Sequence, residues 1–159
     1  MPDAWVRPTS HNDVSSGWND EALAYDTSTG TYAYSNDIFW GGEAFPPSGE
    51  LEFFHDAISC NKIRVWLGET PNNYGETFFR VHCFYSGVWN DLGTVYTYGE
   101  YIEKAIGSTQ VVTGIKLQFL MYDEAQSPSS GRIYDVAFWE VSAGPSIPVV
   151  MHHYKMLRN

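Results

Sequence analysis

The sequence predicts an all-β fold, a β-sandwich of two antiparallel sheets in jelly-roll order. Runs rich in Val, Ile, Tyr, Phe and Trp recur at short intervals between clusters of Gly, Pro, Asn and Ser, the spacing of strands joined by turns. In residues 62–67, Ile63, Val65 and Leu67 alternate with more polar residues, which is the period of a strand with one face on a core. Helical periodicity is nearly absent, so a helical bundle is not expected.

The expected elements follow one another between turn signals. Each strand is rich in β-branched or aromatic residues and is bounded by Gly, Pro, Asn or Ser. Two short helical segments are also predicted, a turn at residues 19–24 and a helix at residues 100–105. Short antiparallel strands in this number form two packed sheets. The predicted strands are residues 31–34, 50–55, 62–67, 77–85, 94–98, 114–122 and 133–141.

Residues 68–76 are predicted to be a hairpin loop, because their Pro, Asn and Gly residues favour turns. Such a hairpin brings Cys60 to the level of Cys83. Two thiols are too few for a disulfide scaffold and wrongly spaced for a zinc site. The alternatives are two buried free thiols and, in an oxidising compartment, one disulfide. A second polar loop is expected at residues 125–131.

Length and charge narrow the class of protein. The chain has 159 residues, a formal net charge of −10, 16% aromatic residues and 18% charged residues. This length indicates one domain, and few charges with many aromatics exclude a disordered chain. The acidity and the lack of a Lys/Arg cluster argue against a nucleic-acid partner. No apolar run reaches the length of a membrane span and no signal peptide is recognised, so synthesis in the cytoplasm without membrane insertion is expected.

Residues 142–159 differ from the rest of the chain. They carry Lys155 and Arg158 and no acidic residue, so the other seven cations and the 19 acidic residues leave −12 on residues 1–141. Two prolines prevent the last strand from simply continuing. The segment is predicted to be an extended C-terminal arm, docked either along its own sandwich or on a neighbouring subunit as an added strand. Its expected contact residues are Ile147, Val149, Val150, Met151 and Tyr154.

Residues 17–33 contain the motif that is most informative about the family. An Ala two residues before an Asp leads into a small polar loop, and a Thr then precedes an aromatic residue: Ala24, Asp26, Thr31 and Tyr32. This motif resembles the opening of galactose-binding-like jelly rolls, which include discoidin domains, coagulation-factor C-terminal domains and carbohydrate-binding modules. Later segments follow in the order of that superfamily. The resemblance implies an N-terminal extension at residues 1–16, a jelly-roll domain at residues 17–141 and the arm at residues 142–159.

Many members of that superfamily hold a structural calcium ion in the loop after the Asp. The resemblance implies Asp26 and Asp135 as acidic ligands and the carbonyl oxygens of Thr27, Thr29 and Thr31 as further ligands. A hard cation of this kind takes about six to eight oxygens. Asp135 stands where a Glu is usual, and Thr27 stands where a Gly is usual. The alternative is an Asx-turn at Asp26 without an ion.

Sugar-binding members of the superfamily stack loop aromatics on pyranose rings and bind hydroxyl groups with polar side chains. The resemblance implies these roles for Trp40, His55, Tyr74 and Trp89, which lie in or beside predicted loops. The alternative is that these side chains belong to the core or to a subunit interface.

The sequence predicts a binding protein and not an enzyme, because it has no nucleophile elbow, no zinc-protease motif, no phosphate-binding loop and no dinucleotide fingerprint. A jelly roll with a docking arm and no export signal resembles virion components such as capsid decoration or tail adhesion proteins. The hypothesis is therefore an oligomeric virion surface protein with a carbohydrate-binding-module-like fold, whose partners are other protein chains and glycans. The alternative is a stand-alone carbohydrate-binding lectin, cytoplasmic or extracellular.

Overall fold

The computed structural model describes residues 3–38, 47–69, 76–96, 99–122 and 130–142. These ranges contain strands and one short 3-10 helix, η1 (Glu21–Tyr25), so the all-β prediction is confirmed. The predicted helical turn at residues 19–24 corresponds to η1. The strands are β1 (Ala4–Val6), β2 (Ser10–Asp13), β3 (Trp18–Asn19), β4 (Ala33–Ser35), β5 (Pro47–Glu69), β6 (Glu76–Tyr85), β7 (Val88–Tyr96), β8 (Tyr101–Tyr122) and β9 (Gly131–Glu140).

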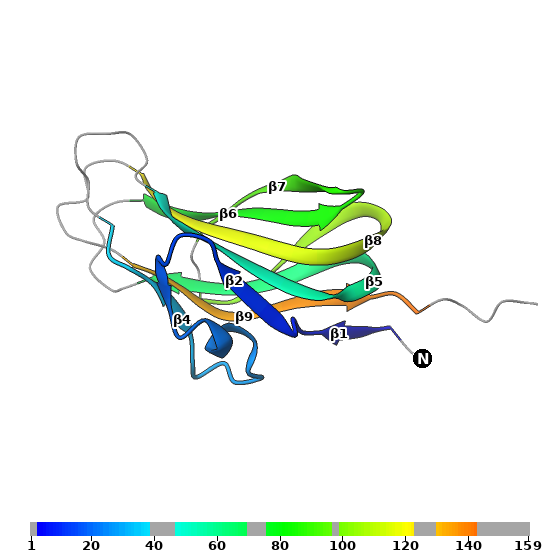
Figure 1. Ribbon diagram of the computed structural model, residues 1–159, viewed down its shortest axis with the longest axis horizontal. Coiled ribbons are helices and arrows are strands. Elements are labelled where there is room, and N and C mark those ends of the chain that lie inside the picture. The colour runs from blue at the N-terminus through cyan, green and yellow to red at the C-terminus, as the bar shows by residue number, and fades with distance from the viewer. Residues whose placement is uncertain (1–2, 39–46, 70–75, 97–98, 123–129, 143–159) are drawn as a thin grey trace, which may run out of the picture.

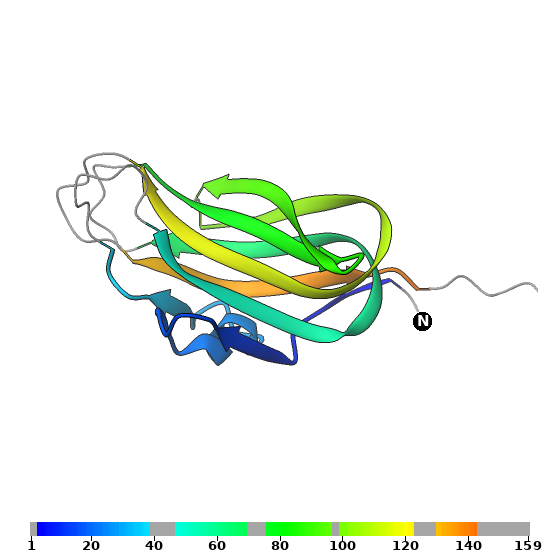
Figure 2. The same ribbon diagram turned by 45° about the horizontal axis from the view of Figure 1, so that its top comes forward.

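The strands form one antiparallel ladder that folds into two layers. Its order is β3-β4-β9-β5-β8-β6-β7, with β1 paired to β9 and β2 paired to β5. The long strands β5 and β8 curl round at one end of the molecule (Figures 1 and 2). Their pairing register shifts between Phe54 and Ile58 and again between Cys60 and Lys62, and such irregularities let a strand bend.

Each long strand therefore contributes one half to each layer. We call the layers sheet I and sheet II. Sheet I contains β2, residues 47–60 of β5, residues 110–122 of β8, β6 and β7. Sheet II contains residues 101–105 of β8, residues 62–69 of β5, β9, β1, β4 and β3. The predicted sandwich of two antiparallel sheets is thus confirmed, with two strands shared between the sheets.

The hydrophobic core lies between the two sheets. Alternate residues of each strand point inward, and burying one large apolar side chain contributes about 1.5–3 kcal/mol. The alternation predicted for residues 62–67 is confirmed, since Ile63 and Val65 are fully buried. Other fully buried side chains are Leu51, Phe53, Phe79, Ile115, Leu117, Phe119, Ile133 and Phe138.

The N-terminal residues belong to the sandwich and do not form an extension before it. Trp5 of β1 lies opposite Trp139 of β9, and His11 of β2 lies opposite Phe53 of β5. Residues 4–6 and 10–13 of the predicted N-terminal extension thus pair with strands of the sandwich, and the domain boundaries themselves stay a prediction. The sequence Ser-His-Asn-Asp of β2 has no apolar alternation because it forms the edge of sheet I, where its side chains stay in contact with solvent.

The predicted helix at residues 100–105 is wrong, because residues 101–105 belong to strand β8. In that strand Lys104 pairs with Ile63 and Ile102 with Val65. Burial alternates residue by residue from Tyr101 to Ile106, with Ile102 and Ile106 packed against the core, which is the period of two that a strand requires. Tertiary pairing here outweighs the helix propensity of Glu, Lys and Ala.

The loop expected at residues 68–76 does not close a hairpin. The strands on either side of it belong to different sheets, since β5 pairs there with β8 and β9 whereas β6 pairs with β7 and β8. Residues 70–75 themselves lie outside the described residues. Cys60 and Cys83 are both buried, and both are free thiols.

The described chain ends just after β9. The amide of Val141 donates to the carbonyl oxygen of Ser59 at 2.8 Å, and the amide of Ser142 donates to the Asp3 carboxylate at 2.9 Å. The arm residues Ile147, Val149, Val150, Met151 and Tyr154 lie outside the described residues, as does residue 143 and everything after it.

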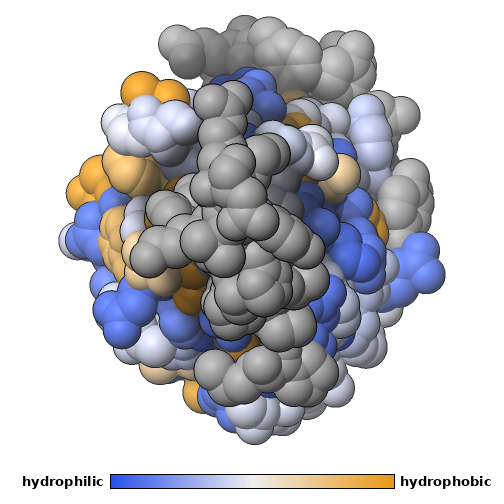
Figure 3. All heavy atoms as spheres, turned by 90° about the vertical axis from the view of Figure 1, so that its right-hand side faces the viewer, coloured by the Kyte–Doolittle hydropathy of each residue, from blue (hydrophilic) through white to orange (hydrophobic). Residues whose placement is uncertain are grey.

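At the end of the sandwich where β1 begins and β9 ends, apolar patches alternate with hydrophilic ones on the visible surface (Figure 3). Exposed apolar side chains elsewhere, such as Val14 and Val88, belong to separate strands or turns. Within the described ranges, no helix has the length and hydropathy that crossing a membrane requires.

The buried thiol of Cys83 makes stability depend on alkaline pH. Burial, helped by the neighbouring Cys60, raises the pKa of Cys83 from 9.0 to about 12. The folded chain therefore keeps this proton between pH 9 and 12 while the unfolded chain releases it, so the stabilisation present below pH 9 is lost as the pH rises. We expect the free energy of unfolding in urea to fall by about 2 kcal/mol between pH 8 and pH 10.5 from this group alone.

Cys83→Ala should flatten this pH dependence, although it lowers stability at every pH by removing buried volume. Val81→Ala, a buried change on the same strand without a titrating group, should keep the wild-type slope. An unchanged slope in Cys83→Ala would contradict the assignment.

Candidate functional site

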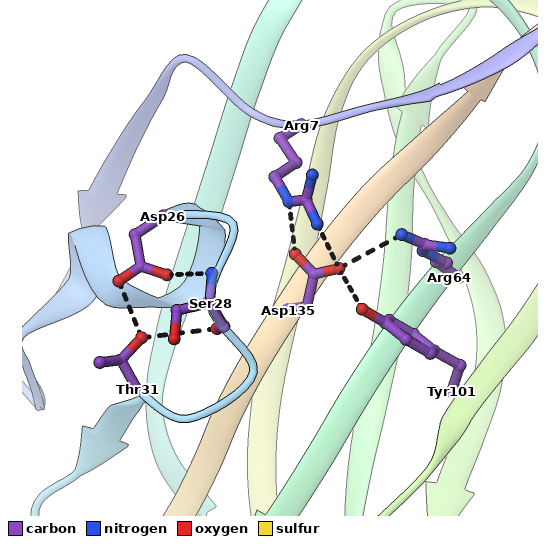
Figure 4. A network of polar contacts seen from close by, with 7 residues as sticks. All are labelled: Arg7, Asp26, Ser28, Thr31, Arg64, Tyr101 and Asp135. Carbon is purple, nitrogen blue, oxygen red and sulfur yellow. Dashed lines mark hydrogen bonds and ion pairs between the residues drawn. The ribbon is translucent and has the colours of Figure 1, made fainter.

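Asp135 is the most completely enclosed charged group among the described residues. It lies midway along β9 and is 2% exposed. Arg7 donates from Nε to Oδ1 at 2.8 Å and from Nη2 to Oδ2 at 3.3 Å. The Tyr101 hydroxyl donates to Oδ2 at 2.8 Å, and Arg64 Nη2 lies 3.5 Å from the same oxygen (Figure 4).

Three separate parts of the chain supply these partners. Arg7 follows β1, Arg64 comes from β5, and Tyr101 begins β8. The hydrogen bond to Asp135 raises the pKa of Arg7, and burial raises the pKa of Tyr101 with a further contribution from the same carboxylate. The Arg64 guanidinium also lies 4.2 Å from the centre of the Tyr101 ring. Asp135 thus ties the N-terminal segment to sheet II.

Asp26 has its own set of partners in the loop after η1. Its Oδ1 accepts a hydrogen bond from the Ser28 amide at 2.8 Å, and its Oδ2 accepts one from the Thr31 hydroxyl at 2.8 Å (Figure 4). The bond from the Ser28 amide is the main reason why the pKa of Asp26 is lowered. Thr27 takes a left-handed backbone conformation, with φ at 77°. These contacts form the Asx-turn that was the alternative to a calcium loop.

The predicted calcium ligands do not form one site around the two acids. A cation at Asp135 would face two guanidinium groups and would have to replace buried hydrogen bonds, so Asp135 does not fit the role of a calcium ligand. Among the described residues, no group of three or more His, Cys, Asp or Glu side chains is placed to hold a metal ion. Calcium binding by Asp26 with the carbonyl oxygens of Thr27, Thr29 and Thr31 stays a prediction.

A pocket of about 410 Å³ opens beside β4 and the start of β9. Aromatic and charged side chains meet at it: the Arg132 guanidinium lies 4.6 Å from the centre of the Tyr32 ring, and Tyr34 is 38% exposed. The rings of Tyr32 and Tyr34 meet edge to face with centres 6.3 Å apart. We call this the tyrosine pocket; its lining residues are Tyr32, Tyr34, Ser35, Asn36, Asp37, Ser130 and Arg132.

The polar groups at the base of the tyrosine pocket are fixed by the fold. Ser35 is buried, and its hydroxyl accepts a hydrogen bond from the Gly131 amide at 2.9 Å. The side chain of Asn36 accepts from Asn19 at 3.0 Å and donates to the Ser16 carbonyl oxygen at 3.4 Å. The Ser35 bond joins β4 to β9, and the Asn36 bonds join the residue after β4 to β3 and to the turn before β3.

The sequence-predicted sugar residues do not line this pocket. Trp40 and Tyr74 lie outside the described residues. His55 lies within β5, where its Nδ1 is 2.8 Å from the carbonyl oxygen of Asp56. Trp89 lies within β7 and packs against Phe84, with ring centres 5.2 Å apart. The structure therefore separates His55 and Trp89 from the tyrosine pocket.

Sequence reasoning passed over Tyr32, Tyr34 and Arg132 as ligand-binding candidates. A usable signal was present, because Tyr32-Ala33-Tyr34 places two tyrosines on the same face of one short strand. Arg132 could not be joined to them from spacing, since β4 and β9 are far apart in the chain. Their pairing, with Tyr34 opposite Arg132, brings these residues together.

Comparison with known proteins identifies the fold. No protein-family model and no curated protein matches the chain. Among solved structures, the C-terminal domain of a chitobiase from Bacteroides fragilis is similar over 89% of this chain and 100% of that chain, with a TM-score of 0.57 and 16% identity. The family 32 carbohydrate-binding module of C. perfringens NanJ, in complex with galactose, is similar over 82% of this chain and 91% of that chain, with a TM-score of 0.51 and 15% identity. The chain shares the fold of family 32 carbohydrate-binding modules.

A third solved structure with a similar fold was determined with a different sugar. The family 32 module of AlyQ, in complex with 4,5-unsaturated mannuronic acid, covers 87% of this chain and 99% of that chain, with a TM-score of 0.54 and 9% identity. A family 89 glycoside hydrolase from Clostridium perfringens is similar over 87% of this chain and 15% of that chain, so the matching fold is one part of that larger enzyme. At these identities the similarity establishes the fold alone, and it confirms the predicted jelly-roll β-sandwich.

Removing the charge of Asp135 should destabilise the sandwich strongly. Asp135→Asn leaves Arg7 and Arg64, each partly buried, without their counter-charge, and we expect a loss of about 2–4 kcal/mol in the free energy of unfolding measured in urea. Asp56→Asn, at an exposed position of β5, serves as the control and should change stability by less than about 0.5 kcal/mol. Equal stabilities of the two variants would show that the network contributes nothing.

Proposed function

We propose that this protein is a non-catalytic carbohydrate-binding module whose tyrosine pocket holds a sugar. The single observation that carries this proposal is the meeting of Tyr32, Tyr34 and Arg132 at one pocket on a carbohydrate-binding-module fold. Its volume of about 410 Å³ lies within the range of small-molecule sites.

The chemistry of the lining suits a pyranose. The exposed ring of Tyr34 offers an apolar face for the C–H groups of a sugar. Arg132 offers several N–H donors in a fixed fork, and Asp37 offers carboxylate acceptors. A sugar hydroxyl both donates and accepts hydrogen bonds. The pocket offers Arg132 as a donor and Asp37 as an acceptor beside an aromatic ring.

The site is held rigidly, which favours binding. The hydrogen bonds of Ser35 to Gly131 and of Asn36 to Asn19 and Ser16 fix the backbone under the pocket before any ligand arrives. A pre-organised site loses less entropy on binding. Galactose is the first sugar to test, because the NanJ module was solved with it.

Loss of the Tyr34 ring should remove sugar binding. We expect wild-type protein to bind spots on a glycan array that displays galactosides and uronic-acid glycans, and Tyr34→Ala to weaken binding of the best sugar by about tenfold or more in calorimetric titration. Tyr34→Phe, which keeps the ring, should retain most of the affinity. Arg132→Ala should weaken binding through loss of hydrogen bonds.

Tyr96→Ala is the matched control, because Tyr96 is also an exposed tyrosine but lies on sheet I. It should leave binding of the same small sugar unchanged. The proposal fails if the array shows no bound glycan, or if Tyr34→Ala binds as wild type does. Repeating the titration in EDTA also tests whether the Asp26 loop needs calcium.

We propose, as a narrower role, that this module works on a virion surface, as a capsid decoration or tail adhesion protein. What supports it is the composition of residues 142–159, a cationic and apolar arm on an acidic body. The stand-alone lectin is the competing role and needs no such docking. Both roles are compatible with glycan binding through the tyrosine pocket.

Deletion of residues 145–159 separates these two roles. If the arm docks on a neighbouring subunit, the shortened protein should lose self-association in analytical ultracentrifugation while its urea unfolding midpoint stays near that of the full chain. A full chain that sediments as a monomer would contradict the docking arm. Unfolding of the shortened protein would place the arm in the sandwich itself and would also contradict docking.

A further inference from the structure

The outer face of sheet I carries an ordered pattern of side chains that the tyrosine pocket does not use. Strands β5, β8, β6 and β7 lie side by side in this layer (Figure 2), and their registers align residues in rows across the sheet. Because every second residue faces outward, four successive rows can be followed from one end of β6 to the other.

Two of these rows are polar and adjacent, and together we call them the polar band. In the first row Glu50, Gln118, Arg80 and Thr94 lie in line, and in the second Glu52, Lys116, His82 and Asp91 lie in line. Three acidic and two basic side chains nearly balance, so the band has little net charge.

Several groups of the polar band have hydrogen-bonding capacity to spare. Arg80 is exposed and makes no ion pair with a described residue. The ring Nδ1 of His82 also has no hydrogen-bond partner among the described residues, but it is buried and so lies out of reach of a ligand on this face. Gln118 donates to the Ser48 carbonyl oxygen at 3.2 Å through Nε2, which leaves its carbonyl oxygen as an acceptor.

Aromatic residues close the band at both ends. On one side Phe78 lies opposite Tyr96, which is 45% exposed. On the other side Phe84 lies opposite Trp89. The Trp89 ring covers Gly114, where an added Cβ would lie 3.0 Å from the ring, and the Lys116 ammonium sits 5.0 Å from its centre.

The face is hollowed between the first aromatic row and the polar band. A depression of about 520 Å³ is lined there by residues of both rows, namely Pro47, Phe78, Arg80, Thr94, Gln118 and Leu120. From Phe78 to Phe84 is six residues of one strand, about 20 Å at the usual strand rise. A single sugar ring cannot bridge that span, but a short oligosaccharide can.

We propose that the outer face of sheet I is a second binding site, which takes a neutral oligosaccharide chain. The oligosaccharide runs along β6, stacks one sugar near Tyr96 and another near Trp89, and hydrogen-bonds to Arg80 and Gln118 between them. Neutral sugars fit better than charged ones because the charges of the band are balanced. The inference rests on the proposed function for the class of ligand, a carbohydrate. The location of the site, the length of the ligand and its contacts are inferred from this face alone.

The first experiment is native electrophoresis in gels that contain galactan, xylan, mannan or β-1,4-glucan. We expect at least one of these neutral polymers to retard the wild-type protein. A hexasaccharide of that polymer should then bind about tenfold or more tightly than its disaccharide in calorimetric titration. No retardation by any polymer, or equal affinities for the two lengths, would overturn the proposal.

Variants place the site on this face. Arg80→Ala and Tyr96→Ala each change an exposed side chain and should weaken hexasaccharide binding about tenfold, and Arg80→Gln should weaken it as well while keeping a side chain of similar length. Val111→Ala, at a position that is 63% exposed, is the control and should bind as wild type does. Hexasaccharide binding that survives both the Arg80 and the Tyr96 changes would also overturn the proposal.

Tyr34→Ala distinguishes failure of this site from failure of the tyrosine pocket. It should leave hexasaccharide binding intact while it removes small-sugar binding. If Tyr34→Ala instead abolishes retardation in the gels, the polymer binds at the tyrosine pocket, and the second site is refuted while the proposed function stands. If Arg80 variants lose the polymer and Tyr34→Ala changes no ligand, the tyrosine pocket is refuted.

Discussion

The buried charge of Asp135 is the constraint on which the arrangement of sheet II depends. A carboxylate that is 2% exposed is tolerated in a protein interior only when it is paired and hydrogen-bonded. Two guanidinium groups, from Arg7 and Arg64, and the Tyr101 hydroxyl contact this carboxylate. The Arg7 guanidinium comes from the N-terminal segment, which therefore has to lie beside β9. The chain before β3 is therefore part of the domain, held by electrostatics as well as by the pairing of β1 with β9.

The Asp135 network also separates the roles of two parts of β9, its middle and its beginning. Its middle is occupied by the Asp135 network, so the acid that the superfamily resemblance assigned to a metal is committed to arginine. Its beginning, at Arg132, is free to meet Tyr32 and Tyr34 across β4. One strand thus carries an internal ion pair and, three residues away, one wall of the tyrosine pocket.

Sequence patterns predicted the parts of this fold that depend on local alternation. Residues 62–67 alternate as expected, and their inward side chains form part of the core. The patterns failed where pairing partners decide the structure. The polar edge strand β2 has no alternation of apolar and polar residues to recognise. The sequence predicts a helix at residues 100–105, but in the structure these residues pair with β5, and Ile102 and Ile106 pack against the core.

The residues of the candidate site were harder to predict than the fold, for a related reason. Arg7 and Asp135 are 128 residues apart in the chain, and a single sequence holds no sign that they form a pair. A family motif therefore assigned Asp135 to calcium, whereas packing assigns it to arginine. Trp89 is predicted as a sugar platform beside a loop, but it lies within β7, opposite Phe84, and its part in sugar binding stays a prediction. Position in the sheet, and not distance from a loop, decides which face an aromatic residue serves.

The two proposed surfaces belong to different sheets, and this separation has a physical consequence. The tyrosine pocket lies on β4 and β9 of sheet II, whereas the polar band lies on the outer face of sheet I, with the core between the two sheets. A short glycan cannot reach both surfaces, so they do not add their affinities for one small ligand. Avidity arises only when the tether between two binding groups spans the sites. Two surfaces arranged in this way would instead hold two glycan chains together, and the rigid core would set the distance between those chains.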